Sequence, residues 1–107
     1  HDARLADQAS LLGESLCATG QSDRGLAALT RQMQADTQTM LFAHAPWLAR
    51  SRAVAGLCAL ANGKAKEAQL LAALARAAFA AQPGVSPYFK APLIKLERKL
   101  GLKLPPP

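Results

Sequence analysis

The sequence has few aromatic side chains and no long uninterrupted apolar run. Aromatic residues make up 5% of the 107 residues, although 50% of the chain is hydrophobic and much of that share is alanine. Because alanine buries little area, such a core requires backbones that approach closely, which favours helices packed on helices. No stretch is long and apolar enough to predict a transmembrane helix. No strand pattern competes with the helical spacing described below.

Sequence motifs of common catalytic and metal sites are also missing. The chain has neither a Walker-type phosphate loop nor the motifs HExxH and GxSxG. His44 is the only internal histidine and has no second His or Cys at ligand spacing, so a surface or capping role is favoured. The sequence therefore predicts a protein that is not an enzyme, with no catalytic residues, no metal site and no cofactor.

Cysteine is scarce as well, with only Cys17 and Cys58. Both lie inside apolar helical runs, far apart and without the close pairing of metal or redox motifs. We predict two small buried residues in a reducing compartment rather than a disulfide, and hence a cytoplasmic location. The chain begins at His1 with no initiator Met, so we expect it to be a piece of a longer protein.

The net charge of +6 is unevenly distributed along the chain. Residues 1–43 carry three arginines and five carboxylates, whereas residues 44–107 carry ten Lys or Arg and two glutamates. Such asymmetry can mark an acidic partner, a nucleic acid or an anionic membrane surface, although a solvated basic face is the simpler interpretation. The two halves are also complementary, so a second copy could stack head to tail.

Helical spacing and helix-end signals divide the chain into helices. One helix runs from Asp2 to about residue 18 and ends at Gly20, and a second begins after Ser22 or Asp23. A third runs over 46–61 and ends at Asn62-Gly63, and a fourth over 65–81. The predicted inward residues of the fourth helix are Leu71, Leu74, Ala75, Ala78 and Phe79.

The last predicted helix follows Pro83 and Gly84. Since Pro92 cannot donate a backbone hydrogen bond, we expect a short turn over 87–90 and then a helix over 92–100 closed by Gly101. Its stripe of Phe89, Leu93, Leu96 and Leu100 should cover a neighbouring hairpin, and its outer face carries Lys95, Arg98 and Lys99. Residues 102–107 should form an extended tail.

The chain partly repeats itself at an offset of 43 residues. Small residues recur at three matched places: in mid-helix, in the loop, and early in the returning helix. These are Gly13, Gly20 and Gly25 in the first copy and Gly56, Gly63 and Ala68 in the second. A small residue in mid-helix lets the returning helix approach, and the loop glycine accepts a left-handed conformation.

This spacing resembles the tetratricopeptide repeat (TPR) family, and NGKAKEA at 62–68 is most similar to its loop and second-helix start. The offset of 43 exceeds the family's usual 34, which implies a long-period variant. Large aromatics are absent at the expected places in the second copy, where Arg52 and Ala59 stand instead. The segment PYFKAPLIKLERKLG is similar to C-terminal TPR segments of bacterial serine/threonine kinases and related signalling proteins.

The resemblance implies an all-α fold, a right-handed α-solenoid of two TPR-like helical hairpins plus a C-terminal capping helix. Its parts would be a repeat domain over 1–101, with hairpins at 3–43 and 44–83 and a cap at 86–101. A polar-faced cap of this kind keeps solenoids soluble. The resemblance also implies a protein–protein interaction module, regulatory or scaffolding, within a larger signalling protein.

The groove of such a module would be lined by the first helix of each hairpin. Helical geometry places Asp7, Ser10 and Glu14 on one such face, and Arg50 and Leu57 on the matching one. We predict that these five residues bind a protein or peptide partner. Ordinary surface and packing roles would explain the same positions.

The alternative function is a basic nucleic-acid-binding helical domain. Its candidate contacts are spread over several helices, and few aromatics exist to stack on bases, so the sequence favours a protein partner over nucleic acid. The candidate basic residues are Arg50, Arg52, Lys64, Lys66, Lys90, Lys95, Arg98, Lys99 and Lys103.

Overall fold

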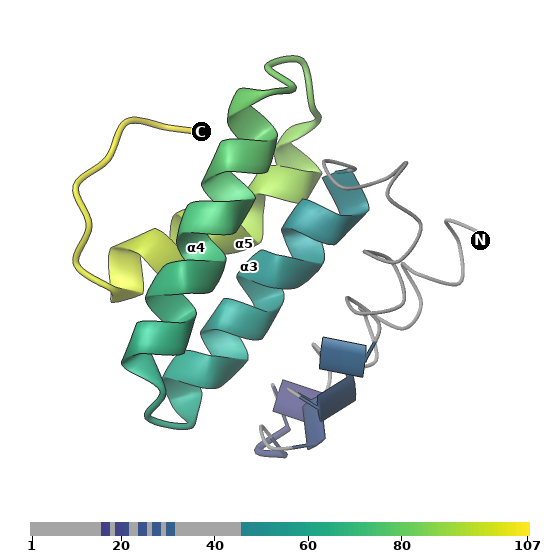
Figure 1. Ribbon diagram of the computed structural model, residues 1–107, viewed down its shortest axis with the longest axis vertical. Coiled ribbons are helices and arrows are strands. Elements are labelled where there is room, and N and C mark those ends of the chain that lie inside the picture. The colour runs from purple at the N-terminus through teal and green to yellow at the C-terminus, as the bar shows by residue number, and fades with distance from the viewer. Residues whose placement is uncertain (1–15, 18, 22–23, 26, 29, 32–45) are drawn as a thin grey trace.

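Three helices pack compactly in the part of the chain that the structure, a computed structural model, describes (Figure 1). The helices are α3 (Pro46–Ala61), α4 (Ala65–Ala80) and α5 (Pro87–Lys99). In Figure 1, α3 and α4 run antiparallel and α5 crosses behind them. The prediction of an all-α fold is confirmed for this part. The described residues are 16–17, 19–21, 24–25, 27–28, 30–31 and 46–107.

The turn between α3 and α4 is closed by a left-handed glycine. Gly63 has a φ of 76°, and its amide donates to the Leu60 carbonyl at 3.0 Å. The Lys64 amide donates to the Ala59 carbonyl at 2.8 Å. These two bonds satisfy carbonyls that the helix end leaves without a partner, in the arrangement known as a Schellman motif. Because only glycine adopts this φ without strain, the predicted role of Gly63 is confirmed.

The same hydrogen bonds recur 43 residues earlier. Gly20 has a φ of 84°, its amide donates to the Cys17 carbonyl at 3.3 Å, and the Gln21 amide donates to the Leu16 carbonyl at 2.8 Å. Gly25 then donates to Gln21 at 2.9 Å, as Ala68 donates to Lys64 at 3.0 Å. Each of these donors and acceptors therefore matches its counterpart in the second loop. The described residues of the first loop share the left-handed glycine and these hydrogen bonds with the second.

A seam of small side chains joins α3 to α4. Ala49, Ala53 and Gly56 recur on α3 at four- and three-residue intervals and are buried. On α4, the fully buried Ala68 and Ala75 and the nearly buried Ala72 have the same spacing. Small residues at such intervals occupy one helix face, so the two backbones can lie close together. The seam is how an alanine-rich chain builds a core with few aromatics.

Gly56 lies where all three helices meet. A Cβ there would overlap the Cδ2 atom of Leu96 on α5, and it would lie 3.5 Å from the Ala68 carbonyl oxygen and 3.5 Å from the Leu71 Cβ on α4. A Cβ at residue 56 would make only ordinary van der Waals contact with α4, so the predicted role of this glycine in the approach of the returning helix is not confirmed. The close approach that leaves no room for a Cβ is that of Leu96 on α5.

We expect Gly56→Val to destabilise the fold by about 1–3 kcal/mol, the usual range for overpacking a close-packed core. Urea unfolding measures the change. In a Leu96→Ala background the same substitution should lower the free energy of unfolding much less, because the side chain with which valine would overlap is absent. An equal cost in both backgrounds would show that the contact with Leu96 is unimportant.

The inward face of α4 is only partly as predicted. Ala75, Ala78 and Phe79 are buried, and Leu71 is half-buried against the core. Leu74, however, is 42% exposed, so its prediction as an inward residue is wrong. The physical reason is the seam: the closest face of α4 holds alanines, which leaves this bulky leucine outside.

Helix α5 begins five residues earlier than predicted. The Ser86 hydroxyl accepts a hydrogen bond from the Tyr88 amide at 3.4 Å, and Pro87 occupies the first turn, where no amide is needed. The prediction of a turn over 87–90 is wrong. Pro92 removes one bond, to Tyr88 near the exposed start of the helix, and Pro92 itself is buried. Gly101 closes the helix at a φ of 75°, as predicted.

The predicted stripe on α5 covers the α3–α4 pair. Leu93 and Leu96 are fully buried, while Phe89 and Leu100 are partly buried against the same core. Lys95, Arg98 and Lys99 on the outer face are exposed, as predicted. Residues 102–107 have no regular structure, and they run back past α4, on the side opposite α3 (Figure 1).

Candidate partner-binding site

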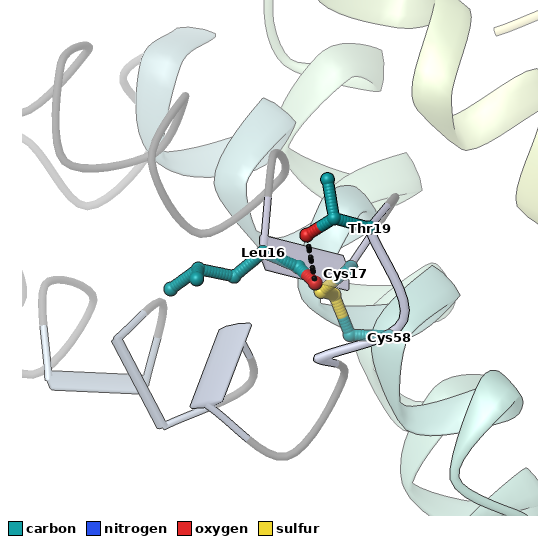
Figure 2. Close-up of a disulfide and its surroundings, with 4 residues drawn as sticks. All are labelled: Leu16, Cys17, Thr19 and Cys58. Atoms are coloured by element: carbon teal, nitrogen blue, oxygen red, sulfur yellow. Dashed lines mark hydrogen bonds between the residues drawn. A yellow bond between two sulfur atoms is a disulfide. The ribbon is translucent and has the colours of Figure 1, made fainter.

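A disulfide joins Cys17 to Cys58 of α3 (Figure 2). The two Cα atoms are 5.8 Å apart, within the normal range for such a bond. Close by, the Thr19 hydroxyl donates to the Leu16 carbonyl at 3.2 Å. The prediction of two free thiols is therefore wrong. The cytoplasmic location that depended on it stays a prediction.

The pairing of the cysteines carried a weak signal in the repeat. Cys17 precedes its loop glycine, Gly20, by three residues, and Cys58 precedes Gly63 by five. If the first helices of the two hairpins run side by side, two cysteines at similar distances from their loop glycines lie at nearly the same level along the paired helices. Helical spacing along the chain alone cannot show this, because it says nothing about which helices are neighbours.

A surface depression of about 220 Å³ lies beside the disulfide. Its α3 wall consists of residues at three- and four-residue intervals, which share one helix face. Lys95 and Lys99, four residues apart on α5, supply its basic side, and both are exposed. The lining residues are Cys17, Val54, Leu57, Cys58, Ala61, Lys95 and Lys99.

Of the five predicted partner-binding residues, Leu57 lies in this depression. Arg50 does not: it is 6% exposed, and its guanidinium carbon lies 4.8 Å from the centre of the Tyr88 ring. Its charge therefore rests on an aromatic face of α5. Asp7, Ser10 and Glu14 lie outside the described residues. Joint binding by the five residues stays a prediction.

A partly buried ion pair that helical spacing did not predict joins α4 to α5. Arg76 Nε donates to Glu97 Oε2 at 2.7 Å and Arg76 Nη2 donates to Oε1 at 3.1 Å, so the pair is bidentate. Arg76 Nη2 also donates to the Pro105 carbonyl, which ties down the tail. The hydrogen bond that Arg76 donates to Glu97 raises the pKa of Arg76, against the opposing effect of burial.

The spacing on α5 contained the signal for this pair. Glu97 lies four residues after Leu93 and three before Leu100, which places it on the buried stripe. A carboxylate there requires a cation, and Arg76 is the one charge in the second half of α4.

The tail covers a further depression of about 210 Å³, lined by Ile94, Glu97, Arg98, Leu102, Leu104 and Pro105 to Pro107.

Arg76→Met should destabilise the fold by about 1–3 kcal/mol, because it leaves the buried Glu97 carboxylate without its guanidinium. Thermal and urea unfolding measure the loss. The double variant Arg76→Met/Glu97→Met should recover most of the lost stability, since an apolar pair replaces a partly buried ion pair at little cost. A double variant no more stable than the single one would contradict this reasoning.

Comparison with protein-family models, with curated protein sequences and with solved structures finds no match for the chain. Among the described residues, no three His, Cys, Asp or Glu side chains come together in a way that could hold a metal ion. Within the same residues, no helix has both the length and the hydropathy that crossing a membrane requires.

Proposed function

We propose that the chain is a protein–protein interaction module in which two TPR-like hairpins form a short right-handed α-solenoid that binds a peptide. The observation that carries the proposal is the repeated loop, in which hydrogen bonds at Gly20 and Gln21 match those at Gly63 and Lys64. A repeat of whole hairpins would explain why the glycine conformation and both acceptors recur at one offset.

The disulfide supports the same arrangement. Cys17 and Cys58 each lie shortly before a loop glycine, and the bond brings the corresponding helix ends together. In stacked hairpins the first helices of successive repeats are neighbours and line one surface. A peptide bound there would cross both first helices.

Helix α5 fits the role of a cap in this proposal. Its buried Leu93 and Leu96 close the core beside α3 and α4, and its lysines and arginine face solvent. A solenoid needs such a terminal element with a polar outer face. Regulation or scaffolding within a larger signalling protein remains part of the proposal, carried by the TPR resemblance alone.

The nucleic-acid alternative is less favoured because two of its candidate arginines are poorly placed. Arg50 is buried beneath Tyr88, and partial burial lowers the pKa of Arg52. The exposed residues among these candidates are spread over the start of α4, the outer face of α5 and the tail. Binding to a phosphate backbone favours a continuous basic surface.

Selection from a phage-displayed library of random 12-residue peptides tests the proposal. We expect enriched peptides that bind the purified chain with micromolar Kd in calorimetry. A filter-binding titration against mixed DNA and RNA at two salt concentrations runs in parallel. No enriched peptide, together with micromolar nucleic-acid binding that falls steeply with salt, would overturn the proposal in favour of the alternative.

Sedimentation of the free chain at low salt tests head-to-tail association.

A further inference from the structure

The depression beside the disulfide has an apolar floor and a basic rim. Val54 is 2% exposed and Cys58 1% exposed, while Leu57 is half-buried, so the floor is part of the packed core. Lys95 and Lys99 lie along the other side and are exposed. None of the described residues that line it carries a carboxylate. The described lining therefore combines apolar surface with two positively charged side chains.

The size of the depression limits what it can hold. Its volume of about 220 Å³ is below the roughly 300–1,000 Å³ of typical small-molecule and cofactor sites. It suits one or two apolar side chains rather than a whole ligand. Peptides bind helical surfaces through such anchor side chains, with charged groups at the edge that set orientation and specificity.

We propose that this depression takes one apolar side chain of an acidic peptide segment, whose neighbouring carboxylates lie beside Lys95 and Lys99. The inference rests on the proposed interaction function and adds to it the chemistry of the partner. Charge complementarity carries it, because the rim offers two cations four residues apart on one helix face and the floor offers only apolar atoms. A nucleic acid would meet the lysines but would leave the apolar floor unused.

The charge on the rim is tested by reversing it. Peptides enriched by the phage selection should contain Asp or Glu next to Leu, Ile, Phe or Met. The variant Lys95→Glu/Lys99→Glu should weaken their binding about tenfold, which is about 1.4 kcal/mol. The matched control is Lys64→Glu/Lys66→Glu, which changes the net charge equally at exposed lysines near the start of α4 and should change Kd less than twofold. Equal losses in both variants would overturn the proposal.

The apolar floor is tested by filling it. Ala61 is exposed and lines the depression, so Ala61→Phe should block the anchor without disturbing the buried core, and binding should fall at least tenfold. Ala73→Phe, at an exposed position of α4, is the control and should leave Kd unchanged. Unfolding midpoints equal to that of the parent chain show that each variant is folded.

The outcomes separate this inference from the proposed function. If peptides bind but carry no acidic residues, or ignore the changes at Lys95, Lys99 and Ala61, the inference fails and the interaction module stands. If no peptide binds at all, the proposed function fails. Replacing the peptide carboxylates by amides should weaken binding to the parent chain about tenfold. The same replacement should change the Kd for the Lys95→Glu/Lys99→Glu variant little.

Discussion

Reduction of the Cys17–Cys58 disulfide should lower the free energy of unfolding by about 4 kcal/mol. The bond closes a loop with a sequence separation of 41 residues, and removing such a crosslink returns that much loop entropy to the unfolded chain. For a domain of this size the midpoint of thermal unfolding should fall by about 15 °C or more.

Thermal scans with and without a dithiol reductant measure this effect. The double variant Cys17→Ser/Cys58→Ser is the control, because its midpoint should match that of the reduced chain and should not respond to reductant. Alkylation of the unfolded chain under non-reducing conditions should detect no free thiol, since neither cysteine is free in the structure. The same thermal midpoint with and without reductant, together with two thiols that react with the alkylating agent, would show that the disulfide does not form.

Phe79→Ala should destabilise the fold by about 3–5 kcal/mol, the range observed when a buried aromatic side chain is truncated. Phe79 is 1% exposed and is the largest fully buried side chain of the described residues. The core around it is mostly alanine, and alanine has no rotamers with which to fill the cavity. We therefore expect a cost toward the upper end of the range.

Urea unfolding measures the Phe79→Ala effect, with Leu70→Ala as the control. Leu70 lies on the same helix but is 61% exposed, so its truncation should change stability by less than about 0.5 kcal/mol. Equal effects of the two substitutions would show that α4 does not pack with its alanine face inward.

The sequence predicted the helices and their ends better than it predicted their contacts. The bounds of α3 and the left-handed glycines at 20, 63 and 101 follow from local chemistry, which a single sequence carries. The start of α5 was missed because tertiary packing of Pro92 and the cap at Ser86 outweigh the loss of one hydrogen bond.

Contacts between helices were harder to predict, because helix α4 is apolar on more than one face. Periodicity alone could not show whether the alanine face or the face with Leu74 packs against α3. Which face packs there depends on how closely α3 approaches. The ion pair of Arg76 and Glu97 and the bond between Cys17 and Cys58 were missed for the same reason. Spacing places Glu97 on the buried stripe of α5 and each cysteine shortly before a loop glycine, but it does not show which segments are neighbours.

Part of the candidate site could be read from the sequence. Leu57 was placed on a binding face by helical geometry, and it lines the depression beside the disulfide. Lys95 and Lys99 were predicted to be solvated, but their proximity to α3 depends on how α5 crosses the hairpin. Arg50 was assigned to the same face as Leu57, yet it packs under Tyr88 because α5 covers that side of α3.

Amide hydrogen exchange, measured residue by residue by NMR, tests the proposal that one hairpin geometry occurs twice in this chain. We expect the hydrogen-bonded amides of both loops to exchange more slowly than in an unfolded peptide, in the same order along each loop. Protection confined to the second loop, with free exchange in the first, would contradict it. The matched amides are those of Gly20, Gln21 and Gly25 and those of Gly63, Lys64 and Ala68.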